Sequence, residues 1–233
     1  MAVRYNPFIT TSNLALYLDA ANTKSYSGSG TTWNDLSGNG NTATMYGTVP
    51  FTTDTTQCFD FATATGAASA SSSLGFTFAS NMVQQTGDFT LSCWIKNPNS
   101  SLGQVGLFSN AGGADGYRFG VGLDGIYFLI GPTYTEGGIL FTSSLSSTLW
   151  YNVVAVYSRS TAQVLCYLNG VYQNAASIPT PQTSFSNATP GIVRSPCCGI
   201  YTGKLAMFSV HNTGLSAANV AQNFNALKGR FGI

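Results

Sequence analysis

The chain has 233 residues and a formal net charge of +1, and only 7% of its residues are charged, against about 25% in ordinary soluble domains. This balance excludes the basic footprint of most nucleic-acid-binding proteins. No run of about 18 uninterrupted apolar residues is present, so we expect no membrane-spanning helix. The first residues lack the apolar segment of a signal peptide, and five cysteines without paired metal spacing indicate reduced thiols in a cytoplasm.

The chain begins with a segment that has no hydrophobic periodicity. We expect residues 1–12 to form an N-terminal arm, followed by one domain over residues 13–233. Alternating leucines in residues 14–18 predict the first strand of that domain. Residues 62–73 are almost all Ala, Ser, Thr and Gly, and we interpret them as an exposed loop.

The clearest strand pattern lies at residues 88–96, where side chains of two kinds alternate. One face is expected to carry Phe89, Leu91, Cys93 and Ile95. The other face carries Trp94 between polar neighbours. Further on, Asp124-Gly125 predicts a two-residue hairpin between two more strands.

Residues 150–175 predict an antiparallel ribbon of three strands. Runs of β-branched and aromatic residues at 150–157 and 163–168 are followed by Asn169-Gly170 and a third run. Asn-Gly favours a type I′ turn, which needs positive φ at both central residues. The residues expected in the interior are Val154, Val156, Leu165 and Leu168.

One helix is expected, near the C-terminus. Ser216 can cap it, and Val220, Phe224 and Leu227 follow at helical spacing. Gly229 stands where a left-handed residue would end it. With about a dozen short strands, the fold class is all-β: an antiparallel two-sheet jelly-roll sandwich with a short C-terminal helix.

Six segments carry a family resemblance: residues 14–22, 33–41, 89–96, 150–154, 167–171 and 203–233. They resemble the laminin-G-like, concanavalin A-like domains common in virion proteins of tailed bacteriophages. The resemblance covers residues 13–233, and its ending is the most specific part. After Phe59-Asp60-Phe61, however, the carboxylates of a family-type calcium site are missing.

The resemblance implies a non-enzymatic structural protein that displays its domain on the exterior of a phage virion, as a capsid decoration, fibre or tail component assembled in the cytoplasm of the host bacterium. The alternative is a glycan-binding adhesin for host attachment. A glycoside hydrolase is less favoured, because such enzymes need two carboxylates across a cleft. Glu136 is expected in a loop without a second acid nearby, and a Ser-His-Asp relay would have to use His211, the only histidine.

Candidate binding residues are few. Trp94 either stacks on a sugar or a partner or is covered by a neighbouring loop, and Trp33 is either a second contact or a loop anchor. Asp35, Asn39 and Asn41 share one loop, which either holds calcium or forms a turn with Asx hydrogen bonds. No other cofactor is expected.

Both chain ends are expected to serve assembly. The residues proposed to contact a neighbouring copy or another virion protein are Arg4, Tyr5, Pro7, Phe8, Arg230 and Phe231. Few surface charges would have to be desolvated in such contacts. We expect a symmetric homo-oligomer, a trimer in a phage setting, which also binds other virion proteins or a host-surface glycan.

Overall fold

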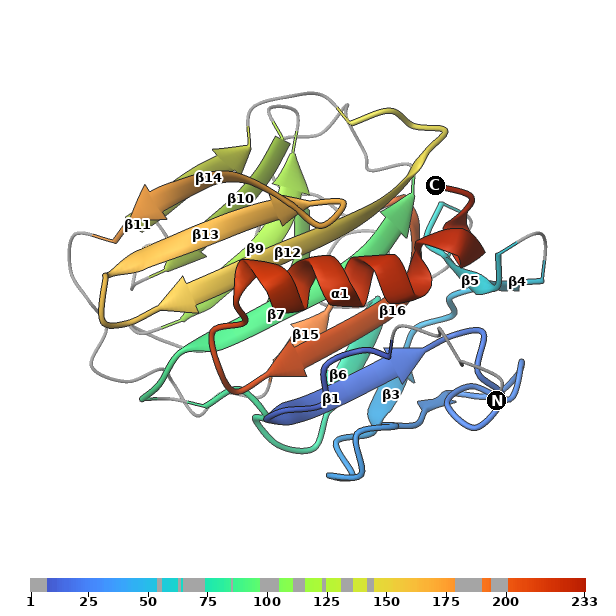
Figure 1. The fold of residues 1–233 in the computed structure, drawn as a ribbon. Helices are drawn as coiled ribbons and strands as arrows, with labels where there is room; N and C mark the ends of the chain where they lie inside the picture. The colour runs from blue at the N-terminus through green and yellow to red at the C-terminus, as the bar shows by residue number, and fades with distance from the viewer. Residues whose placement is uncertain are drawn as a thin grey trace, which may run out of the picture.

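The computed structural model describes residues 8–53, 56–62, 64, 74–84, 86–96, 105–110, 116–122, 125–130, 136–141, 145–178, 190–193 and 201–233. They form two antiparallel sheets of eight strands each, packed as a sandwich, with one α-helix lying across the outside of the first sheet (Figure 1). The expected fold class, an all-β jelly-roll sandwich with a short C-terminal helix, is confirmed.

The first sheet contains β1 (Leu14–Asp19), β4 (Phe51–Thr52), β5 (Cys58–Asp60), β7 (Phe89–Lys96), β12 (Trp150–Ser158), β13 (Gln163–Leu168), β14 (Val171–Ser177) and β16 (Lys204–His211). Its order is β14-β13-β12-β7-β16-β5-β4, and β1 also pairs with β16. The first strand of the domain therefore lies beside the last one.

The second sheet contains β2 (Thr32–Trp33), β3 (Ala43–Tyr46), β6 (Gly75–Phe78), β8 (Val105–Ser109), β9 (Tyr117–Gly122), β10 (Gly125–Ile130), β11 (Glu136–Phe141) and β15 (Gly191–Ile192). Its order is β11-β10-β9-β8-β15-β6-β3-β2. The expected pairing of β9 with β10 is confirmed, but Gly125, which was expected in the turn, is the first residue of β10 and pairs with Gly122. Glu136 starts β11 and pairs through its backbone with Ile130, so its expected place in a loop is wrong.

The core lies between the inner faces of the two sheets. The alternation of β7 is confirmed, because Phe89, Leu91, Cys93 and Ile95 all belong to the main core cluster. Cys58, Cys93 and Cys166 are buried, and burial raises the pKa of the Cys166 thiol to about 12. They act as small apolar side chains. Cys197 and Cys198 lie outside the described residues.

The ribbon formed by β12, β13 and β14 has the predicted turn. Asn169 and Gly170 have φ values of 50° and 77°, which satisfy the need of a type I′ turn for positive φ at both positions. The turn sets the register in which Leu168 pairs with Val171. The hairpin prediction is confirmed.

The prediction of which side chains of this ribbon face the core is only partly right. Leu168 packs against the main core, as expected. Val154, Val156 and Leu165 instead belong to a separate cluster with Leu215 and Val220. They lie on the outer face of the sheet, where the C-terminal segment covers them. The inner face of β12 carries Val153, Ala155 and Tyr157.

Helix α1 (Ala217–Leu227) begins as expected at Ser216, whose hydroxyl accepts a hydrogen bond from the Asn219 amide at 3.2 Å. Its end differs from the prediction. The chain continues from Leu227 into the 3₁₀ turn η1 (Lys228–Phe231), and Gly232, with φ 72°, is the left-handed residue in place of Gly229. The extra turn carries Arg230 and Phe231 back onto the domain.

The described part of the arm, residues 8–12, lies on the domain's own helix. The Gln222 side chain donates to the Phe8 carbonyl at 2.7 Å, and the Thr10 amide donates to the Asn223 side-chain oxygen at 2.6 Å. This stretch therefore makes its described contacts with its own domain, and the expected contact with a neighbouring copy stays a prediction. Among the described residues, no helix has the length and apolar character needed to cross a bilayer.

Candidate functional site

An open hollow at one end of the sandwich is the candidate binding site. We call it the asparagine hollow, and its volume is about 320 Å³, at the lower end of the usual range of about 300–1,000 Å³ for ligand sites. Its lining residues are Asn13, Leu14, Ala15, Asn39, Asn41, Met82 and Asn212. Four asparagine side chains thus surround a small apolar surface.

Strand pairing brings these distant residues together. Leu14 is paired with His211, so the start of β1 meets the end of β16 at the same end of the first sheet (Figure 1). The Asn212 amide then donates to the Asn13 carbonyl at 2.8 Å. Asn13 has a φ of 51°, a left-handed conformation that asparagine tolerates better than most residues.

The loop that follows β2 supplies the other side of the hollow. Asp35 organises this loop, because its carboxylate accepts hydrogen bonds from the backbone amides of Tyr17, Ser37 and Asn41 and from the Ser37 hydroxyl, at 2.7–3.0 Å. These bonds place Asn39 and Asn41 beside the start of β1. The Asp35 carboxylate therefore holds the lining residues Asn39 and Asn41 in place, although Asp35 does not itself line the hollow.

The structure brings the three predicted calcium ligands together, but in a hydrogen-bonded turn. Both Asp35 oxygens are occupied as described, and the side-chain nitrogens of Asn39 and Asn41 donate to main-chain carbonyls at 2.8 Å. Of the two alternatives for this loop, the Asx-bonded turn is the one present. Calcium binding here stays a prediction. Among the described residues, no cluster of three or more His, Cys, Asp or Glu side chains is placed to hold a metal ion.

The two tryptophans proposed to bind sugar are buried, and neither offers a ring to a ligand. Trp33 is 0% exposed and packs against Phe59 and Phe76 in the core. Trp94 is 2% exposed, and rings of the C-terminal segment cover it. Of the alternatives for each residue, the structure therefore shows Trp33 as a loop anchor and Trp94 as a covered ring.

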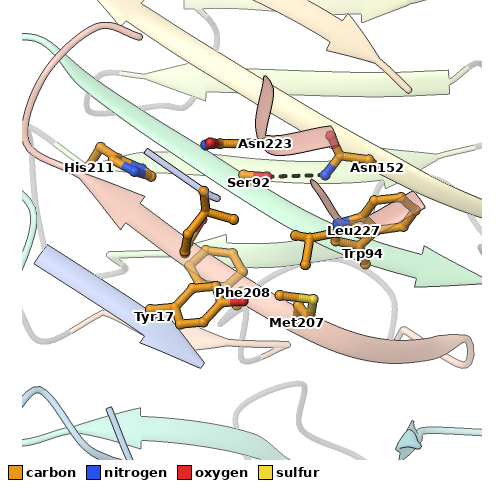
Figure 2. Close-up of a pocket in the computed structure, with 11 residues that line it drawn as sticks. Tyr17, Ser92, Trp94, Asn152, Met207, Phe208, His211, Asn223 and Leu227 are labelled. Atoms are coloured by element: carbon orange, nitrogen blue, oxygen red, sulfur yellow. Dashed lines mark hydrogen bonds between the residues drawn. The ribbon is translucent and has the colours of Figure 1, made fainter. Parts of the chain in front are cut away.

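A second, much smaller cavity lies beneath α1. Figure 2 shows the residues around it, which include Trp94 at one end, His211 at the other and Ser92, Asn152 and Asn223 between them. Its volume is about 20 Å³, room for roughly one water molecule. Asn152 donates to the Ser92 hydroxyl at 3.2 Å across its floor. A sugar ring cannot enter a space of this size.

His211 is a structural residue of this small cavity. It is 1% exposed, and its Nε2 atom lies 2.9 Å from the Thr10 carbonyl oxygen. Burial lowers the pKa of its imidazole, although the hydrogen bond to Thr10 opposes that shift. The ring ties the arm to the end of β16 and is enclosed away from the surface.

The described aspartates other than Asp35 also stabilise the fold. Asp19 pairs with Arg230 at 2.6 Å, Asp60 pairs with Lys204 at 3.4 Å, and Asp88 accepts a hydrogen bond from the Arg159 backbone amide at 2.8 Å. None of them lines the asparagine hollow. The described part of the chain therefore shows no pair of carboxylates facing each other across this site.

Of the proposed assembly residues, Arg230 and Phe231 belong to the domain itself. Phe231 is 6% exposed, and Arg230 pairs with Asp19, so both side chains are engaged within their own domain, and their role in assembly stays a prediction. Phe8 is 71% exposed and remains available to a partner. Arg4, Tyr5 and Pro7 lie outside the described residues.

Sequence reasoning missed Asn13, Met82 and Asn212 as lining residues. They come from three distant segments, and only the pairing of β1 with β16 brings Asn13 and Asn212 together. The one local signal was an asparagine directly before the first strand, a position where asparagine often adopts positive φ.

Comparison with known families and structures agrees with the architecture. The family model described as the concanavalin A-like lectin/glucanases superfamily matches residues 68–221. No curated protein sequence matches the chain.

Several solved structures share the fold. The binding domain of botulinum neurotoxin DC in complex with rat synaptotagmin II is 16% identical, with a TM-score of 0.69, and the match covers 92% of this chain and 52% of that one. A structure of botulinum neurotoxin type C, which depends on interaction with two ganglioside molecules to enter cells, is 17% identical, with a TM-score of 0.71 and coverage of 92% and 51%.

The binding domain of Paraclostridial Mosquitocidal Protein 1 is 18% identical, with a TM-score of 0.69 and coverage of 92% and 52%. The chain thus spans about half the length of the structures it resembles. At these identities the likeness establishes a shared lectin-like fold.

Proposed function

Because the chain belongs to the concanavalin A-like lectin/glucanases superfamily, we propose that it is a non-enzymatic domain that binds a glycan on a cell surface. The site is the asparagine hollow. Three structural neighbours are binding domains of toxins or toxins that engage gangliosides, and this supports a role in attachment.

The observation that carries the proposal is the chemistry of the hollow. Asn13, Asn39, Asn41 and Asn212 surround it, and Met82 belongs to its apolar part. Amide groups form hydrogen bonds with sugar hydroxyls without a charge, and small apolar side chains suit the C–H faces of a sugar ring. A few convergent polar groups around an apolar surface are typical of ligand sites.

The same lining argues against hydrolysis. Glycosidases place two carboxyl groups about 5–10 Å apart on either side of the bond they cleave. The described lining of the hollow has amides where such an enzyme would have an acid and a base, and the Asp35 carboxylate behind it is occupied by four hydrogen bonds. The proposed role is therefore to hold a glycan and not to cleave it.

A glycan array with the purified protein tests this function. We expect binding to a subset of glycans, and no release of reducing ends when the bound glycans are incubated with the protein. Failure to bind any glycan would contradict the proposal. Release of reducing ends would contradict its non-enzymatic part.

We further propose that the domain acts on the exterior of a tailed-bacteriophage virion, as an adhesin in a capsid, fibre or tail assembly. The segments at residues 14–22 and 203–233 support this through their resemblance to phage proteins, and the low charge of the chain suits close packing with neighbouring subunits. Assembly in the host cytoplasm and a homotrimer belong to this proposal. Two measurements test this proposal. Binding of an antibody against the domain to intact virions, together with a light-scattering mass of three chains for the purified protein, would support it. A monomeric mass and no antibody binding to virions would contradict it.

A further inference from the structure

The amides that line the asparagine hollow are oriented by the main chain. The side-chain nitrogen of Asn39 donates to the Leu14 carbonyl at 2.8 Å and to the Ser37 hydroxyl at 3.0 Å. That of Asn41 donates to the Ala15 carbonyl at 2.8 Å. Turning either amide over would place its oxygen against a carbonyl oxygen, so both orientations are fixed.

The fixed orientation leaves the side-chain oxygens of Asn39 and Asn41 as acceptors for a ligand. The side-chain oxygens of Asn39 and Asn41 accept no hydrogen bond from any described residue, and Asn39 is exposed. The side-chain amide of Asn212 already forms hydrogen bonds through both of its polar atoms. Its nitrogen donates to the Met82 carbonyl, and its oxygen accepts from the Gln84 backbone amide. Asn13 forms no side-chain hydrogen bond to a described residue and is the one adjustable amide.

The charged side chain described beside the lining of the hollow is an acidic one. No Lys, Arg or His belongs to its lining. The Asp35 carboxylate lies directly behind it, where it accepts a hydrogen bond from the Asn41 amide at 3.0 Å. An anionic ligand would meet amide oxygens and a nearby negative charge, without a cation or a set of fixed donors to stabilise it.

Resting on the proposed glycan-binding function, we propose that the hollow selects neutral saccharides and rejects acidic ones. Hydroxyl groups of the sugar donate to the side-chain oxygens of Asn39 and Asn41, and its C–H face lies on Leu14, Ala15 and Met82. A carboxylate accepts hydrogen bonds but donates none, so the carboxylate of a sialic or uronic acid cannot take the place of a hydroxyl group at these two oxygens.

The test compares a neutral oligosaccharide that binds on the array with the same oligosaccharide carrying a terminal sialic acid at the sugar that occupies the hollow. Affinities are measured by calorimetry in buffer with EDTA, so that a bound cation cannot supply the missing charge. We expect at least about tenfold weaker binding of the acidic form, which corresponds to about 1.4 kcal/mol. Equal or tighter binding of the acidic form would overturn the inference, and this comparison needs no variant.

Variants then locate the site. Asn39→Ala and Asn41→Ala should each weaken binding of the neutral form at least about tenfold, whereas Asn174→Ala, on exposed β14, should leave it unchanged. Asn13→Lys should improve binding of the acidic form, because it adds a donor with positive charge. If the wild type binds but the hollow variants bind equally well, the site is wrong and the proposed function stands. If the wild type binds neither form nor any other glycan, both proposals fail.

Discussion

Phe231 stacks on Trp94, with ring centroids 3.9 Å apart and ring planes within 8° of parallel. Trp150 contacts the same phenylalanine, at 5.1 Å between centroids, and the neighbouring Arg230 pairs with Asp19 at 2.6 Å. The last residues of the chain therefore close the outer face of the first sheet. This contact explains why Trp94, on the polar side of its strand, is buried.

Phe231→Ala should lower the free energy of unfolding by about 3–5 kcal/mol, as for other buried phenylalanines. The substitution removes a ring that is 6% exposed and uncovers Trp94. Urea denaturation followed by tryptophan fluorescence measures both effects. Ile233→Ala, at a residue that is 40% exposed, is the control. Equal stability of the two variants would show that the Phe231 ring does not stabilise the outer face of the first sheet.

The sequence predicted the features that are encoded locally. Alternation in β7 identified its inner face, and Asn169-Gly170 identified a turn whose backbone angles match. Local patterns did not identify the inner face of β12, because both of its faces are apolar: one meets the core and the other meets Leu215 and Val220. Periodicity cannot distinguish two buried faces of one strand.

The asparagine hollow could be predicted only in part, for a different reason. The loop with Asp35, Asn39 and Asn41 is recognisable as a turn or an ion site, but its partners Asn13 and Asn212 are almost 200 residues apart along the chain. Their proximity depends on the register of β1 against β16. A sequence pattern without strand pairing does not contain that information.

Gly170→Val should destabilise the protein by at least about 2 kcal/mol. Gly170 has a φ of 77°, which a β-branched residue resists, and an added Cβ atom would lie 2.9 Å from the Phe224 ring. Gly229→Ala is the matched control, because nothing lies within 4 Å of a Cβ atom there. A thermal melt of the two variants compares them. An unchanged melting temperature for Gly170→Val would contradict the assigned turn.

Asp35→Ala should lower the free energy of unfolding by about 2–4 kcal/mol, because it removes a charged acceptor shared by four hydrogen bonds. We expect the loss to be the same in calcium and in EDTA, and the melting temperature of the wild type to be unaffected by EDTA. A calcium-dependent rise in melting temperature that disappears in Asp35→Ala would instead support the calcium alternative.

Acid should weaken the attachment of the arm through His211. The imidazole donates from Nε2 to the Thr10 carbonyl at 2.9 Å when neutral, and its Nδ1 atom has no hydrogen-bond partner among the described residues. A second proton on Nδ1 would therefore place a buried charge without an acceptor. Burial accordingly lowers the pKa of His211 in the folded protein, more than its hydrogen bond to Thr10 raises it.

The direction of the pH effect follows from this lowered pKa. In the unfolded chain the imidazole takes up its proton near pH 6.5, whereas the folded protein does so only at lower pH. The contribution of His211 to stability is complete above about pH 6.5 and is lost as the pH falls from there through the folded-state pKa. Urea denaturation at pH 7.5 and 5.5 should show the wild type losing more stability than His211→Gln, whose amide can still donate to Thr10 and does not titrate. An identical loss in both proteins would mean that a group other than His211 senses the acid.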